Sequence, residues 1–159
     1  MSEPTTPPQD TANVVALPPL IYLGPLTLGL VLNAVWPRPL LPQRAARIMG
    51  LTVTAGALSV GGAAFAALRR AGTPPDPGQP TTAIVARGPY RFSRNPIYLA
   101  FTLLYAGLAL VANALWPLAL LPGVLVVMRR GVIDREERYL DQRFGDEYRA
   151  YTARVRRWL

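Results

Sequence analysis

One uncharged run of 34 residues, residues 95–128, constrains the fold of this chain more than any other feature. As a single α-helix the run would be about 51 Å long, whereas the hydrocarbon core of a bilayer is about 30 Å thick. The run must therefore break, and Asn113 and the Trp116-Pro117 pair are the natural hinge. The pattern predicts an antiparallel helical hairpin formed by residues 97–112 and 115–128.

Two further uncharged runs lie in the N-terminal half, at residues 17–36 and 48–68. Each is close to the ~20 residues that a helix needs to cross a bilayer. The composition agrees, because 51% of the 159 residues are hydrophobic and 16% are charged, which is too apolar for an ordinary soluble domain. The sequence therefore predicts an all-α integral membrane protein with four transmembrane helices, the last two forming the hairpin.

The segments outside these runs set the domain organisation. Residues 1–16 contain several prolines and no helical period, so we expect a mobile tail before a single membrane domain at residues 17–159. Residues 71–80 are rich in proline and glycine and predict a non-helical connector. An extended segment is expected at residues 81–86.

Helix signals also mark the region around and after the hairpin. Asn95 followed by Pro96 is a good start for the first arm, with Asn as the N-cap. The second arm is expected to continue as a helix through residues 129–143 and to end at Gly145. A last amphipathic helix is expected at residues 146–158, on the membrane surface.

The arginines predict the orientation in the membrane. All 17 basic residues are arginines, with three between the first two apolar runs, five between the second and third, and nine after the hairpin. Cytoplasmic loops carry the excess of positive charge, so both termini and the connector are expected on the cytoplasmic side. We expect a multi-pass protein of the bacterial inner membrane whose active site is cytoplasmic.

The composition also excludes several kinds of chemistry. The formal charge of +8 suggests an anionic partner, but the arginines lie at the ends of apolar runs, as expected for anchors against anionic lipid, and we predict no nucleic-acid partner. The chain contains no Cys, His or Lys, which excludes disulfides, thiolate nucleophiles, imidazole bases and Schiff bases. We expect no metal site, since the usual zinc ligands are absent.

A pair of carboxylates follows the hairpin. On a helix, Glu137 would lie on an apolar face with Ile133, Leu140 and Phe144, and Glu136 would border that face. Carboxylates in such a place need cationic partners or a cationic ligand to offset the cost of burial. Pairing with arginines alone remains the alternative, and the candidates for it are Arg87, Arg91, Arg94 and Arg130.

The polar residues flanking the hairpin form a recognisable set. They are Gly88 and Tyr90, then Arg94, Asn95, Pro96 and Tyr98, then Glu136, Glu137 and Leu140, then Phe144, Gly145, Tyr148 and Tyr151. This set resembles the isoprenylcysteine carboxyl methyltransferase family, which is related to the membrane phospholipid methyltransferases. The family pattern is a Gly-x-Tyr turn, Arg-His-Pro-x-Tyr, Glu-Glu-x-x-Leu and Phe-Gly-x-x-Tyr-x-x-Tyr. The resemblance covers the C-terminal half, from Thr81 onward.

The resemblance implies a membrane enzyme that binds S-adenosylmethionine in a cytosolic pocket formed by residues 81–98 and 129–159, and that takes a lipophilic acceptor from the bilayer. The expected cofactor-binding residues are Thr82, Ala83, Ile84, Val85, Gly88, Tyr90, Asn95, Pro96, Ile97, Tyr98, Glu136 and Glu137. Arg94, Asn95 and Glu137 are expected to be catalytic, and Arg130, Ala100 and Leu104 to contact the acceptor.

One position departs from the family pattern, since Asn95 stands where His is usual. An amide cannot titrate near neutrality, so a general base is not expected there. This favours methyl transfer to a carboxylate of an isoprenylcysteine-like acceptor, which needs no base. The alternatives are phospholipid N-methylation and a non-catalytic four-span transporter or scaffold. The absence of an ionisable residue inside the apolar runs counts against a transporter.

Overall fold

A computed structural model describes residues 11–12, 14–76 and 78–159. The elements in chain order are α1 (Pro18–Val35), α2 (Gln43–Arg70), the 3₁₀-helix η1 (Gly88–Arg91), α3 (Pro96–Val111), α4 (Leu115–Met128), the π-helix η2 (Arg129–Ile133), α5 (Asp134–Phe144) and α6 (Asp146–Thr152). The described residues form helices and no strands, which confirms the all-α prediction.

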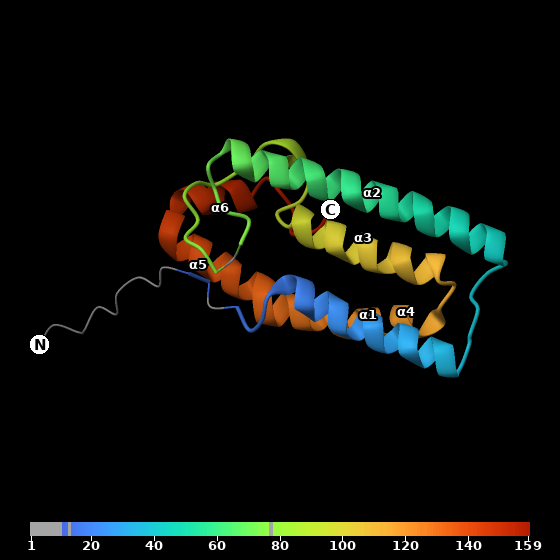
Figure 1. The fold of residues 1–159 in the computed structure, drawn as a ribbon. Helices are drawn as coiled ribbons and strands as arrows, with labels where there is room; N and C mark the ends of the chain where they lie inside the picture. The colour runs from blue at the N-terminus through green and yellow to red at the C-terminus, as the bar shows by residue number, and fades with distance from the viewer. Residues whose placement is uncertain (1–10, 13, 77) are drawn as a thin grey trace, which may run out of the picture.

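The helices are arranged as two pairs (Figure 1). α2 lies along α3, and α1 lies along α4. The connector before α3, together with α5 and α6, gathers at one end of these pairs, while the α1–α2 connection and the α3–α4 turn lie at the other end. The polar segments that the sequence analysis singled out therefore meet at one end of the molecule.

Three helices of the described residues are long and apolar enough to cross a membrane. They are α1, α2 and the continuous helix Leu115–Phe144, of which α4 is the apolar part and η2 and α5 the charged continuation. α3 has 16 residues, about 24 Å, which is shorter than the ~30 Å hydrocarbon core. Three candidate crossings are therefore found, and a fourth through α3 stays a prediction.

Glycines allow the paired helices to approach closely. A Cβ atom built on Gly50 of α2 would lie 2.5 Å from the backbone nitrogen of Val111, and one on Gly107 of α3 would lie 2.4 Å from Thr54 Oγ1. Close approach of α2 and α3 therefore depends on Gly50 and Gly107. Gly56 and Gly62 have no atom within 4 Å of such a Cβ and face outward.

The predicted turn of the hairpin is at Asn113, which has a φ of 50°. Asn tolerates this left-handed conformation better than most residues. Its Oδ1 accepts hydrogen bonds from the backbone N–H groups of Leu40 (3.0 Å) and Leu41 (3.2 Å), and its Nδ2 donates to Leu41 O (2.8 Å) and Gln43 Oε1 (3.2 Å). One side chain therefore fastens the α3–α4 turn to the α1–α2 connection.

The segment before α1 differs from the mobile tail expected at residues 1–16. Residues 1–10 and 13 lie outside the described part of the chain. The backbone N–H of Val15 donates to Gly131 O at 3.2 Å, and a Cβ on Gly131 would lie 2.6 Å from Val15 Cγ2. Ala12 is only 6% exposed. The mobile-tail expectation is therefore wrong for this packed part.

The C-terminal region follows the prediction up to Gly145 and departs from it afterwards. Gly145 has a φ of 50°, which favours glycine, and it separates α5 from α6 as expected. The last helix ends at Thr152, however, and not near residue 158. The helix is shorter than predicted because the following segment turns back to hydrogen-bond the residues before α3.

Candidate active site

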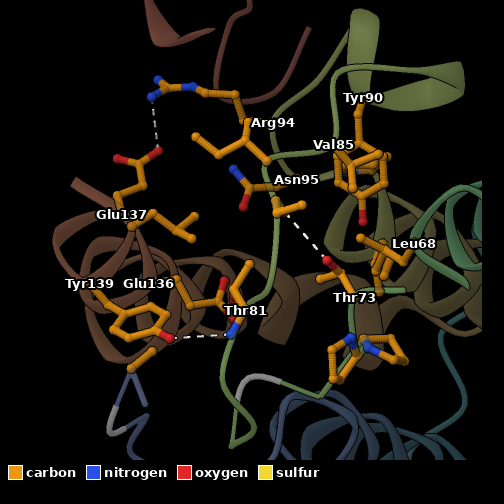
Figure 2. A pocket seen from close by; sticks show the side chains of 18 of the residues that line it. Leu68, Thr73, Thr81, Val85, Tyr90, Arg94, Asn95, Glu136, Glu137 and Tyr139 are labelled. Carbon is orange, nitrogen blue, oxygen red and sulfur yellow. Dashed lines mark hydrogen bonds and ion pairs between the residues drawn. The ribbon is translucent and has the colours of Figure 1, made fainter. Parts of the chain in front are cut away.

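A cavity lies at the polar end of the molecule, between the connector, the start of α3, and α5 with α6 (Figure 2). Its volume of about 140 Å³ is roughly ten times what a single water molecule needs, so it can hold part of an organic ligand. In Figure 2, Glu136 and Glu137 of α5 lie across the cavity from Val85 and Tyr90. The cavity thus lies between two segments that are about 45 residues apart in the sequence.

Most of the predicted site residues line this cavity. They are Ala83, Ile84, Val85, Tyr90, Arg94, Asn95, Pro96, Ile97, Tyr98, Glu136 and Glu137. Five predicted residues lie outside its lining, namely Thr82, Gly88, Ala100, Leu104 and Arg130.

Two of these five belong to the surrounding loops. The Thr82 hydroxyl is hydrogen-bonded to Thr73 Oγ1 at 2.8 Å and donates to Gly72 O at 3.1 Å, so it holds the connector together beside the cavity. Gly88 has a φ of 58° and begins η1, which accounts for a glycine at this turn. Thr82 and Gly88 therefore support the cavity wall without lining the cavity.

The three positions expected to contact the acceptor lie elsewhere. Ala100 is 5% exposed and faces α2, where a Cβ on Gly61 would lie 3.3 Å from the Ala100 Cβ. Arg130 is exposed on η2, and Leu104 is partly buried on α3. Ala100 packs against α2, and an acceptor contact at these three positions stays a prediction.

Glu136 is the acidic residue with the least solvent contact at the site. The Tyr98 hydroxyl donates to its Oε1 at 2.6 Å. Burial raises the pKa of the Glu136 carboxyl to about 7; the bond from Tyr98 lowers this pKa, and the charge of Glu137 raises it further. Glu136 lies in α5, beyond the apolar segment Leu115–Met128. It is therefore a carboxyl that exchanges a proton near neutral pH.

Glu137 is bound by arginines. Arg94 Nη1 lies 3.3 Å from Glu137 Oε1, Arg157 Nε donates to the same oxygen at 3.1 Å, and Arg157 Nη2 contacts Glu137 Oε2. Glu137 therefore has arginine partners, and its expected contact with the cofactor stays a prediction. Arg94 was among the expected partners, whereas Arg157 was not.

Arg94 also carries a donor that is not used. Its Nε is buried and has no hydrogen-bond partner among the described residues. Its side chain is 18% exposed and also bonds Tyr148, while its backbone N–H donates to Arg156 O at 2.9 Å. An unpaired buried N–H beside a cavity is costly and suits an anionic ligand group.

Asn95 is 8% exposed and occupies the N-cap position of α3 without capping the helix through its side chain. Its Nδ2 donates instead to Arg157 O at 3.0 Å, and its backbone N–H donates to Ser93 Oγ at 3.1 Å. The expectation of a side-chain N-cap is wrong, because the C-terminal segment offers the amide a carbonyl.

The sequence analysis did not assign several residues that line the cavity. Ala12, Leu68, Thr73, Pro74, Pro75, Asp76, Thr81, Tyr139, Leu140, Tyr148 and Tyr151 complete the lining. Leu140 and the last two tyrosines belonged to the motif set and could have been assigned from it. The connector residues carried no signal beyond their proline content.

The tyrosines of the site stay protonated and can donate hydrogen bonds. Burial raises the pKa of Tyr148 to about 12 and raises that of Tyr90 above its usual range. Two hydroxyls tie the walls together, since Tyr151 donates to Tyr90 O at 2.9 Å and the Thr81 N–H donates to Tyr139 Oη at 3.2 Å. No group of side chains among the described residues is arranged to hold a metal ion.

Comparisons with known proteins identify the family of this chain. A family model described as phospholipid methyltransferase matches residues 45–147, more than half of the chain. An uncharacterized protein of Haemophilus influenzae is 54% identical over 35 residues, which are 22% of this chain and 56% of that protein, so the chain spans about half of the relative it matches. No solved structure matches. The chain therefore belongs to the phospholipid methyltransferase family.

Proposed function

We propose that this protein is a membrane S-adenosylmethionine-dependent methyltransferase that binds its cofactor in the cavity between α5 and residues 73–98 and acts on a lipophilic acceptor. The observation that carries the proposal is that Glu136, a half-buried carboxyl with a raised pKa, and Arg94, whose buried Nε has no hydrogen-bond partner among the described residues, line the same cavity. The family to which the chain belongs supports it.

The charges of the residues present fit this cofactor. Its ammonium and sulfonium groups are cationic, and Glu136 is the carboxyl that arginine leaves unmatched, since Glu137 is already paired. Its carboxylate is anionic and suits the free Nε–H of Arg94. The phenols of Tyr90 and Tyr98 add donors and apolar ring surface.

The cofactor supplies an activated methyl group when bound, and the protein supplies orientation and a dry environment. The apolar lining residues Ala83, Ile84, Val85 and Ile97 exclude water from the site. Transfer of a methyl group from a cation to an anion removes both charges, and such a step is favoured where water is excluded.

The proposal has two forms, which differ in whether a carboxylate or an amine accepts the methyl group. A carboxylate acceptor of the isoprenylcysteine type needs no base. An amine acceptor must lose a proton, and Glu136, whose pKa is raised to about 7, can take one even though the chain contains no His or Cys. This carboxyl makes phospholipid N-methylation a full second candidate.

We further propose that the acceptor reaches the cavity from the bilayer. The cavity is bordered by Leu68 at the end of α2 and by Pro96 and Ile97 at the start of α3, both of which are apolar helices. A hydrocarbon tail would therefore remain among apolar surfaces while its head group reaches the cavity.

The test combines cofactor binding with identification of the product. Purified protein is titrated with S-adenosylmethionine and S-adenosylhomocysteine by calorimetry, and is then incubated with membrane lipids and labelled S-adenosylmethionine. A base-labile label that releases methanol identifies a carboxyl ester, whereas a base-stable label on a headgroup identifies an amine acceptor. Absence of both cofactor binding and transfer would refute the proposal.

The matched variants are Glu136→Gln and Glu147→Gln. Both replace one carboxylate by an amide of the same shape, but Glu147 is exposed on α6. Loss of cofactor affinity is expected for the first only, by about tenfold or more, as for a hydrogen bond to a charged group.

A further inference from the structure

The segment after α6 joins the two walls of the cavity. Arg156 O accepts a hydrogen bond from the Arg94 N–H at 2.9 Å. Arg157 O accepts from the Ser93 hydroxyl at 3.2 Å and from Asn95 Nδ2 at 3.0 Å. The main chain of two successive residues thus fixes the turn that precedes α3.

The side chain of Arg157 reaches the opposite wall. Its guanidinium donates from Nε to Glu137 Oε1 at 3.1 Å, contacts Glu137 Oε2 through Nη2, and places Nη1 3.0 Å from Asp134 Oδ1. The two carboxylates are one turn apart on α5, and the planar fork of an arginine matches such an arrangement. The bond to Glu137 and the two neighbouring carboxylates raise the pKa of Arg157, so it stays charged.

The contact between Arg157 and Glu137 affects how Arg94 is bound. Glu137 is 17% exposed and has two arginine partners. Arg157 supplies most of the hydrogen bonds to Glu137, whereas Arg94 makes a single 3.3 Å contact with it, and the buried Arg94 Nε has no hydrogen-bond partner among the described residues. Without Arg157, Glu137 would depend on Arg94 alone and would draw the Arg94 guanidinium toward itself.

We propose that Arg157 is a positioning residue of the active site: by holding Glu137 against α5 and the Ser93–Asn95 turn against the C-terminal segment, it keeps the Arg94 donor directed to the cofactor. The inference rests on the proposed function for its last step. The joining of the two walls does not depend on any cofactor.

The first experiment tests the joining without a ligand. Hydrogen exchange of the amides of residues 94 and 95 is measured for the parent protein, Arg157→Gln and Arg154→Gln. Arg154 carries the same charge in the same segment, but it is exposed and its side chain donates to Ala150 O, away from the cavity walls joined by Arg157. We expect about tenfold faster exchange at these two amides in Arg157→Gln and parental exchange in Arg154→Gln. Parental exchange in Arg157→Gln would overturn the proposal.

The second experiment tests the effect on binding. The affinity for S-adenosylhomocysteine, measured by calorimetry, is expected to fall about tenfold in Arg157→Gln and by a smaller factor in Arg157→Lys, which keeps the charge but not the planar fork. In a Glu137→Gln background, Arg157→Gln should add less than about twofold, because the effect passes through Glu137. A full additional loss in the double variant, or an equal loss in Arg154→Gln, would overturn the proposal.

The two experiments separate this inference from the proposed function. If the parent protein binds neither S-adenosylmethionine nor S-adenosylhomocysteine, the proposed function fails, and the exchange experiment still decides whether Arg157 joins the walls. If Arg157→Gln does not fold, Arg157→Lys takes its place in both measurements. Exchange and affinity equal to the parent in every foldable variant would leave Arg157 without a positioning role.

Discussion

Cofactor affinity should rise with pH through the ionisation of Glu136, and Glu136→Gln should remove that rise. The carboxyl has its pKa raised to about 7 by burial, and only its ionised form attracts a cationic ligand. The carboxyl is mostly protonated at about pH 5 and mostly ionised at about pH 8, so the dissociation constant should fall by about tenfold or more between these values, as for the loss expected in Glu136→Gln.

The assay is calorimetric titration with S-adenosylmethionine across this range for the parent, Glu136→Gln and Glu147→Gln. The cofactor's own groups titrate equally in all three proteins. The ratio of the parental to the variant dissociation constant therefore reports the ionisation of the Glu136 carboxyl alone. The exposed Glu147 is the control and should leave the parental slope. A parental slope in Glu136→Gln, or a flat profile in the parent, would refute the reasoning.

The same carboxyl makes a prediction about stability that needs no ligand. The pKa of Glu136 is higher in the folded protein than its usual 4.5, so the folded state binds the proton more tightly. Its stabilising contribution is therefore full below about pH 4.5 and is lost as pH rises to about 7, by up to about 3 kcal/mol. Chemical unfolding in detergent should show this decline in the parent and not in Glu136→Gln.

Three further outcomes are expected. Gly131→Ala should displace the segment before α1 and slow cofactor binding or methyl transfer, whereas Gly123→Ala, which has open space around its Cβ, should behave as the parent in both assays. Asn113→Ala should lower the free energy of unfolding by about 2–4 kcal/mol, because it leaves backbone groups of the α1–α2 connection unpaired; a change below about 0.5 kcal/mol in a denaturant titration would contradict this. In intact cells an impermeant thiol reagent should label Arg44→Cys and not Gly78→Cys, and the reverse pattern would contradict the predicted orientation.

The helices were predictable because hydrophobic runs leave few options in a membrane. The runs 17–36, 97–112 and 115–128 agree with α1, α3 and α4 to within one residue at each end. Most of the cofactor-site residues carried over from the motif pattern also meet in one cavity. In these parts a local pattern determines the structure, so no knowledge of distant contacts was needed.

The rest depends on contacts between distant residues. An amphipathic pattern continues past Thr152, so the sequence did not show that the chain leaves the helix to accept hydrogen bonds from the Ser93–Asn95 turn. The partner of Glu137 lies 20 residues away, among several arginines of similar sequence context. The proline-rich connector forms a cavity wall only because α5 lies opposite it. This arrangement cannot be predicted from the composition of the connector.

The π-helix η2 determines the direction in which the side chains of α5 point around the helix axis. A π-turn takes up one residue more than an α-turn, so α4 and α5 keep their mutual phase as if that residue were absent. If the same residues relaxed to an α-helix, each later side chain would be advanced by about 100° around the axis, and Glu136 would turn out of the cavity. Deletion of one residue together with a change of η2 to an α-helix should therefore keep Glu136 at the cavity, whereas either change alone should not.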